Sequence, residues 1–94
     1  MASSKEYLDY VLEQAAPAAL TWRAMMGEYI LYYEGRIVGG IYDDRLLVKP
    51  VPAARALLPQ AREETPYPGA KPMLLVEEVD RRGFLAELFA AMAD

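Results

Sequence analysis

TWRAMMGEYILYYEGRIVGGIYDDRLLVK, residues 21–49, is the stretch that decides the fold. Aromatic and β-branched side chains dominate it, and short turn-prone breaks interrupt it at Gly27, Glu34-Gly35 and Asp43-Asp44. Breaks this short favour antiparallel neighbours, because parallel neighbours need long crossover connections. The stretch therefore predicts an antiparallel meander of four strands, over residues 21–26, 28–33, 36–42 and 45–49.

An amphipathic helix is predicted before the meander, over residues 3–16. Its apolar side chains recur at helical spacing, and Ser3 with Glu6 has the pattern of a capping box, with Ser3 as N-cap. Pro17 ends the helix, because the residue before a proline is disfavoured in the helical conformation.

Two further helices and a strand are predicted after the meander. Prolines bound a short helix over residues 52–58, and residues 73–76 form an apolar strand. Asp80 is the expected N-cap of the last helix, whose apolar stripe comprises Phe84, Leu85, Leu88, Phe89 and Met92. Residues 60–71, QAREETPYPGAK, are predicted to be a long loop that is functional or packs over the sheet.

The whole chain, residues 1–94, is therefore predicted to be one α+β domain. Its elements follow the order α-β-β-β-β-α-β-α, with an antiparallel meander sheet packed against helices. A chain of 94 residues with 54% hydrophobic residues can build one core without disulfides.

Composition excludes several kinds of catalytic site. The chain has no cysteine and no histidine, so it lacks thiolate nucleophiles, the commonest general base and the commonest transition-metal ligand. It contains no phosphate-binding loop and no nucleophile elbow. The adjacent acids Asp43 and Asp44 are interpreted as a solvated turn. We predict no enzyme, and no catalytic, cofactor-binding or metal-binding residue.

The net charge of −4 disfavours nucleic acid and anionic membrane as partners. No apolar run is long enough to span a membrane, and the N-terminus has no signal-peptide pattern, so we expect a cytoplasmic protein. Direct DNA binding would require the basic side chains to gather on one face, namely Arg23, Arg36, Arg45, Lys49, Arg55, Arg62 and Lys71.

The predicted strand over residues 28–33 carries apolar side chains on both faces. A sheet that packs on one side only would show a polar residue at every second position. We therefore expect a dimer partner or the loop at 60–71 to cover the second face. The pair Gly39-Gly40 weakens the next strand and predicts a bulge, or the close approach of a helix or ligand, with packing the favoured interpretation.

Charged and aromatic side chains in and around the sheet are the candidates for an interaction surface. Tyr67 is held rigidly between two prolines, and Lys49 and Lys71 each precede a proline where a strand ends or begins, a position suited to an anionic ligand. The complete set of candidate interaction residues is Arg23, Tyr29, Tyr33, Lys49, Tyr67 and Lys71.

Four short motifs resemble the N-terminal domain of the TfoX (Sxy) competence regulators, in particular its small stand-alone members. They are RAMMG at 23–27, IYDD at 41–44, LLVKP at 46–50 and PYPGAKPM at 66–73, together with the strand pair around residues 29–33. The resemblance covers nearly the whole chain through the order of these motifs.

The resemblance implies a fold similar to type III secretion chaperones, often dimeric, and a role in bacterial transcription control. Full-length TfoX proteins promote the expression of DNA-uptake genes, in some bacteria together with the cyclic-AMP receptor protein. They carry a second, C-terminal domain, which residues 1–94 do not include. The resemblance supplies no catalytic motif.

Two classes of function follow from these observations. The first is a protein-interaction domain of a TfoX-like regulator, which forms a homodimer and contacts another transcription regulator. The alternative is a small-ligand-binding module or unrecognised enzyme that uses the Gly39-Gly40 strand together with Lys49 and Lys71.

Overall fold

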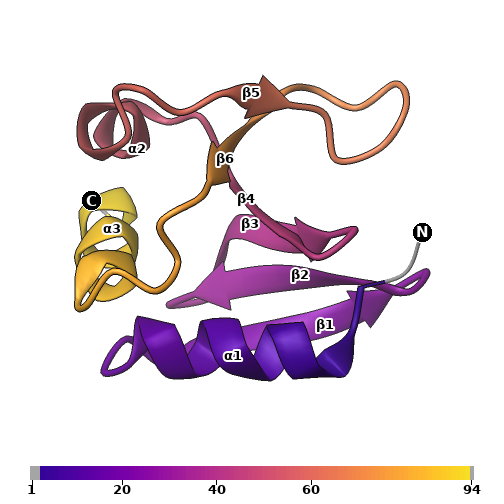
Figure 1. Ribbon diagram of the computed structural model, residues 1–94, viewed down its shortest axis with the longest axis horizontal. Helices are drawn as coiled ribbons and strands as arrows, with labels where there is room; N and C mark the ends of the chain where they lie inside the picture. The colour runs from indigo at the N-terminus through magenta and orange to yellow at the C-terminus, as the bar shows by residue number, and fades with distance from the viewer. Residues whose placement is uncertain (1–2, 94) are drawn as a thin grey trace.

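The computed structural model describes residues 3–93 and confirms the predicted α+β class (Figure 1). The described residues contain three helices and six strands. In chain order they are α1 (Lys5–Ala15), β1 (Leu20–Met25), β2 (Glu28–Tyr33), β3 (Arg36–Tyr42), β4 (Arg45–Val48), α2 (Pro52–Leu57), β5 (Glu63–Glu64), β6 (Met73–Val76) and α3 (Phe84–Met92).

All six strands form one antiparallel sheet in the order β1-β2-β3-β4-β6-β5. The meander from β1 to β4 is as predicted. β6 pairs with β4, and β5 then pairs with β6 through Glu63↔Leu74 and Glu64↔Met73. The prediction of a continuous loop over residues 60–71 was therefore incomplete, because two of its residues form the outer strand β5.

Three two-residue turns set the meander. Both turn residues have positive φ at Met26-Gly27 (53° and 85°), at Glu34-Gly35 (52° and 80°) and at Asp43-Asp44 (55° and 55°). Positive φ at both central residues gives the backbone twist that matches paired antiparallel strands. Aspartate tolerates this conformation better than most non-glycine residues, which explains how a turn without glycine joins β3 to β4.

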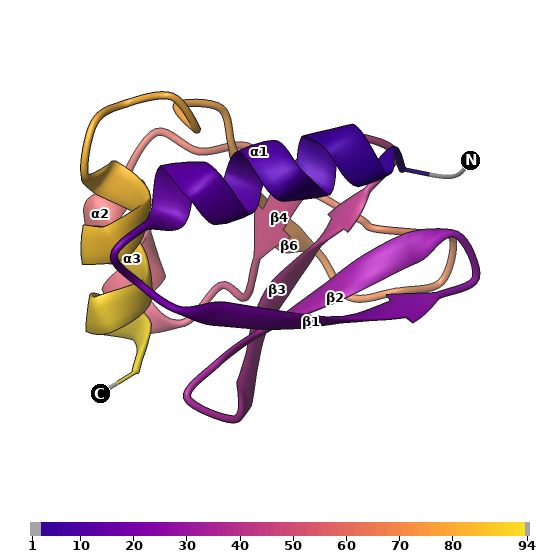
Figure 2. The ribbon, with the colours of Figure 1, turned by 90° about the horizontal axis from the view of Figure 1, so that it is seen from below.

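The core lies between one face of the sheet and the helices α1 and α3. Figure 2 shows α1 alongside the sheet and α3 beside α2 at one end of the molecule. Strand register places Leu31, Ile41, Leu46 and Val48 on the same face, and all four are fully buried. They join Leu8 and Val11 of α1 and Leu85, Leu88 and Phe89 of α3, which are also fully buried. Burying each of these side chains contributes about 1.5–3 kcal/mol.

The glycine pair in β3 is explained by neighbouring protein atoms. The register shifts between Leu31 and Tyr32, so a bulge does occur in this part of the β2–β3 pairing. A Cβ atom on Gly39 would lie 2.1 Å from the carbonyl oxygen of Leu47. One on Gly40 would lie 2.6 Å from the ring of Tyr42. Both glycines are buried and enclosed by the adjacent strands, in agreement with packing as the favoured interpretation.

The N-cap of α1 is Ser4, so the prediction of Ser3 was wrong. The Ser4 hydroxyl oxygen accepts a hydrogen bond from the Tyr7 backbone N–H at 3.1 Å. Ser3 is used elsewhere: its hydroxyl donates to Glu28 Oε1 at 2.6 Å and accepts from the Asp44 backbone N–H at 3.0 Å. The start of α1 is thereby attached to two turns of the meander.

The N-cap of α3 is Gly83, at φ 75°, so the prediction of Asp80 was also wrong. Arg81 and Arg82 consequently lie in the turn that precedes the helix rather than in its first turn. The Arg81 guanidinium lies 5.0 Å from the centroid of the Phe84 ring and 3.7 Å from Glu78 Oε1. These contacts give Arg81 a structural role at the entrance to α3.

Candidate functional site

The six candidate residues fall into three separate regions. Arg23 and Tyr29 lie on the paired strands β1 and β2, where Tyr29 is half-buried against the core. Tyr33 and Lys49 line one groove near α2 and α3. Tyr67 and Lys71 lie in the connection from β5 to β6, at the opposite end of the molecule from those helices (Figure 1). Lys49 and Lys71 are therefore not brought together.

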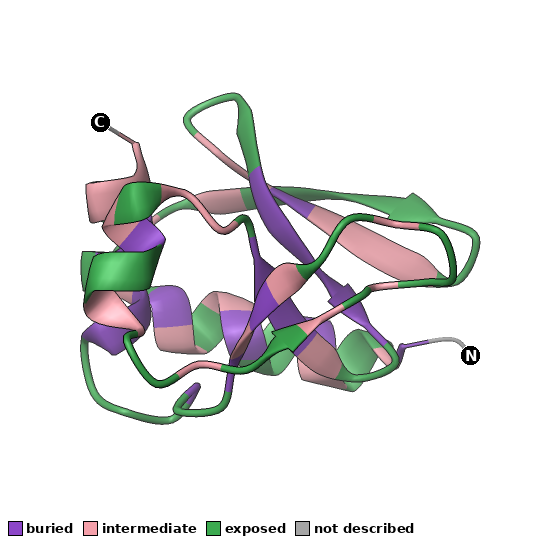
Figure 3. Ribbon diagram, turned by 90° about the horizontal axis from the view of Figure 1, so that it is seen from above, coloured by how far each residue is buried: buried purple, intermediate pink, exposed green. Residues whose placement is uncertain are grey.

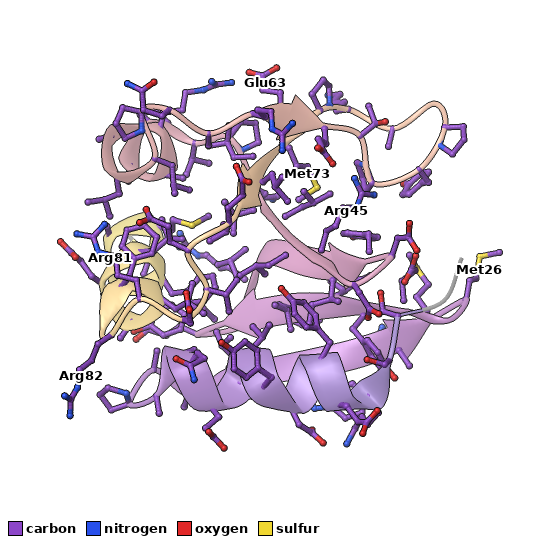
Figure 4. The ribbon with its side chains drawn as sticks, in the orientation of Figure 1. Met26, Arg45, Glu63, Met73, Arg81 and Arg82 are labelled. Atoms are coloured by element: carbon purple, nitrogen blue, oxygen red, sulfur yellow. The ribbon has the colours of Figure 1, made fainter. Side chains whose placement is uncertain are left out.

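The first region is the outer edge of the sheet, formed by β1. Residues 21–26 are all exposed, including Trp22 and Met25, each 40% exposed, and Met26, which is 95% exposed. Figure 3 contrasts this exposed strand with the buried residues of β3 and β4, and Figure 4 shows Met26 at the tip of the β1–β2 hairpin. We call Trp22, Arg23, Met25 and Met26, with the backbone that joins them, the β1 edge surface.

Aromatic and cationic contacts hold Trp22 in place. Its ring meets the ring of Tyr29 edge-on, at 5.4 Å between centroids. The Lys5 ammonium lies 5.5 Å from the Trp22 ring centroid, a distance at which cation–π attraction operates. Trp22 is therefore a positioned aromatic side chain with one side open to solvent.

The second region, the segment that connects β5 to β6, covers part of the sheet face opposite the core. A cover for this face was predicted, either by a dimer partner or by the loop at 60–71. Tyr67 lies 6.4 Å from Tyr42 between ring centroids, and Arg45 forms an ion pair with Glu64 of β5. Leu47 on the same face is fully buried. The β5 to β6 segment thus covers this face near β3 and β4, whereas Arg23 and Met25, on the same face of β1, stay exposed.

Burial raises the pKa of the Tyr42 phenol above its ordinary value, with Tyr67 and Glu28 adding to the shift. Burial also raises the pKa of Tyr7, helped by Tyr10 and Asp44. Both phenols therefore remain protonated at neutral pH and act as packing groups rather than as bases.

The third region is an open groove of about 1100 Å³ between α2, the C-terminal half of α3 and the end of the β2–β3 hairpin. Its walls are mainly apolar and include Val38, Val51, Leu57 and Met92. Tyr33 stands in one wall and stacks on Phe89 of α3, with 6.5 Å between ring centroids. We call this hollow the α2–α3 groove.

Three charged side chains line the α2–α3 groove: Arg36, Lys49 and Glu87. Among the described residues, the ion pairs of arginine and lysine involve Lys5, Arg45, Arg55, Arg62 and Arg81, but neither Arg36 nor Lys49. The sequence indicated Lys49 and Tyr33 as interaction candidates and Arg36 only as a possible DNA contact. It did not indicate Glu87, which lies far from the other three along the chain. Three of the basic residues that direct DNA binding would require, Arg45, Arg55 and Arg62, each pair with a nearby carboxylate, which offsets their positive charge.

Residues 3–93 contain no cluster of three or more carboxylate, histidine or cysteine side chains that could hold a metal ion. No helix within that range is long and apolar enough to cross a membrane.

A protein of known sequence is similar to this chain. It comes from Spirochaeta aurantia and bears only the description "uncharacterized 12.7 kDa protein in trpE 5′ region". The two are 36% identical over 80 residues, which make up 84% of this chain and 70% of the relative. No protein-family model matches the chain, and no solved structure matches it either.

Proposed function

This chain belongs to the same family as the Spirochaeta aurantia protein, and from that premise we propose a protein-interaction domain without catalytic activity. The proposed interaction surface is the β1 edge surface. The proposed partners are a second copy of the chain and, through the resulting homodimer, a protein of bacterial transcription control in the cytoplasm.

The exposed edge strand is the observation that carries this proposal. β1 is six residues long, lies at the end of the strand order and has a partner strand on one side only. An edge strand presents a row of backbone donors and acceptors to which another strand can be added. β1 contains no proline or lysine, two residues with which proteins commonly block such an edge.

The side chains of the β1 edge surface have the chemistry of an interface. Tryptophan, methionine and arginine are enriched at the centres of protein–protein contacts, and all three occur among the four residues of this surface. Met25 and Met26 add exposed apolar area at the hairpin tip. A flexible methionine fits a partner's surface well because its side chain adapts to irregular shapes.

The TfoX resemblance supports the regulatory part of the proposal. The motif RAMMG at 23–27 includes three of the four side chains of the β1 edge surface. The residues that carry the resemblance therefore overlap with the exposed edge. A protein partner also suits the net charge of −4 better than a nucleic acid does.

Sedimentation equilibrium of the wild type and of Met25→Lys tests the self-association. We expect a dimer for the wild type and a monomer for the variant, because a lysine on an edge strand opposes the addition of another strand. Gln60→Lys adds the same charge at an exposed position outside β1 and should leave the dimer intact. A wild type that stays monomeric, or a Met25→Lys protein that still dimerises, would contradict the proposed surface.

Affinity capture from a lysate of the native host tests the regulatory role, with wild type and Met25→Lys as parallel baits. The wild type should recover RNA polymerase or a transcription regulator such as the cyclic-AMP receptor protein, and the variant should not. Equal recovery by both baits would mean that the partner does not bind through the β1 edge surface. Recovery of no such protein by either bait would count against a role in transcription.

A further inference from the structure

We propose that the α2–α3 groove binds an amphiphile with a single negative charge: a carboxylate that meets Arg36 and Lys49, attached to an unbranched apolar chain that lies along the groove. This site is separate from the β1 edge surface. The groove adjoins α2 and α3, whereas Met26 marks the opposite end of the molecule (Figure 4).

The walls of the groove favour an apolar chain. Val38, Val51, Leu57 and Met92 line it, and Ile37 at its edge is 43% exposed. A ligand with an apolar chain could cover this isoleucine and the apolar walls. Each methylene of the ligand that is buried there would contribute about 0.8 kcal/mol to binding. The volume of about 1100 Å³ slightly exceeds the usual range of small-molecule sites, about 300–1,000 Å³, as expected of an open groove.

The charges of the groove favour an anionic head group. Arg36 and Lys49 contribute two positive charges and Glu87 one negative charge, which leaves +1 in a protein whose net charge is −4. A lone positive excess matches a carboxylate better than a doubly charged phosphate. Neither cation is used in an ion pair among the described residues, although five other basic side chains are.

The backbone places both cations at one end of the sheet. The Lys49 N–H donates to the Val38 carbonyl oxygen at 2.9 Å, so Lys49 directly follows the paired part of β4. Arg36 begins β3, two residues before Val38. One head group can therefore be approached by a guanidinium, which binds a carboxylate through two parallel hydrogen bonds, and by an ammonium.

Three probes separate the contributions of the head and the tail. Decanoate has both, acetate has the head alone, and decyltrimethylammonium has the same tail with the opposite charge. Each is titrated below its micelle concentration into the ¹⁵N-labelled chain, and amide shifts are followed by NMR. We expect saturable shifts with decanoate, centred on Ala53, Ala56 and Ala91 in the groove, and none with acetate or decyltrimethylammonium.

Variants locate the site. Lys49→Gln and Arg36→Gln should each weaken decanoate binding about tenfold, the cost of losing one charge-assisted hydrogen bond. Ala56→Phe, at an exposed position in the wall, should fill the groove and abolish binding. Arg82→Gln removes a charge from an exposed side chain outside the groove lining, directed away from the body of the protein in Figure 4, and should bind as the wild type does.

Clear results would overturn the proposal. They are an absence of saturable shifts with decanoate, equal binding of decyltrimethylammonium, shifts centred on β1, or unchanged affinity in both Lys49→Gln and Arg36→Gln. A melting curve for each variant shows whether it is folded. If Ala56→Phe does not fold, Lys49→Gln and Arg36→Gln are sufficient to test the site. The dimerisation test does not involve the groove, so either proposal can fail without the other.

Discussion

β1 and β4 belong to the same antiparallel sheet, yet they have opposite environments. β1 is exposed at every residue after Leu20, whereas Leu46, Leu47 and Val48 of β4 are completely buried. The sequences LTWRAM and RLLV are both mainly apolar, so composition does not explain the difference. Position in the sheet explains it.

β4 is enclosed in every direction, and β1 is not. β3 and β6 flank β4, and the core helices and the β5 to β6 segment cover its two faces. β1 has β2 on one side and only partial cover from α1, through the contact of Lys5 with Trp22. The comparison shows that an apolar strand left at the edge is surface available for binding, while the same kind of strand in the centre stabilises the fold.

The largest expected loss of stability comes from adding a side chain where β3 and β4 are in close contact. Gly39→Ala would place a Cβ atom 2.1 Å from the backbone oxygen of Leu47, which cannot move aside as a flexible side chain would. We expect the free energy of unfolding to fall by at least about 3 kcal/mol in urea denaturation. Thr21→Ala, on the open strand β1, should change it by less than about 0.5 kcal/mol. A stable Gly39→Ala protein would contradict the close approach of β3 and β4.

A smaller effect should come from two side chains on the same face of the sheet. Leu47→Ala removes a fully buried side chain and should cost about 3 kcal/mol, whereas Met25→Ala, 40% exposed, should cost less than about 1 kcal/mol. Thermal unfolding followed by circular dichroism measures both. Similar losses for the two variants would mean that this face is covered over β1 as well as over β4.

The smallest effect concerns pH. Because the pKa of Tyr42 is raised in the folded state, the unfolded chain loses the phenolic proton first as pH rises. The free energy of unfolding is therefore unaffected by this group below about pH 10 and falls as pH rises from there through the folded pKa. Tyr42→Phe should show a shallower fall than the wild type in urea denaturation at successive pH values. Identical curves would mean that cover by the β5 to β6 segment does not affect this phenol.

Most of the fold could be predicted because its signals are local. The turns at Met26-Gly27 and Glu34-Gly35 need positive φ, and glycine marks them in the sequence. β5 could not be predicted, because Glu63 and Glu64 have no strand propensity and pair only through the presence of β6. The choice of Ser4 over Ser3 as helix cap likewise depends on Glu28 and Asp44, which lie far along the chain.

The candidate sites were predicted less well, for the same physical reason. Residue chemistry indicated Arg23, Tyr33 and Lys49, which lie on the two surfaces proposed here. It could not indicate that Arg36 and Glu87 line the α2–α3 groove, because that hollow exists only after α2, α3 and the β2–β3 hairpin have packed together.

The local character of the meander also fixes an order of events. From β1 to β4, paired residues lie at most 13 positions apart, as in Leu20↔Tyr33, whereas β4 and β6 pair residues 26 to 30 positions apart. Closing the longer loop costs more chain entropy, so we expect the first four strands to assemble before β6 arrives. The β1 edge, which is proposed to bind a partner, is then formed before β6 and β5 complete the other side of the sheet.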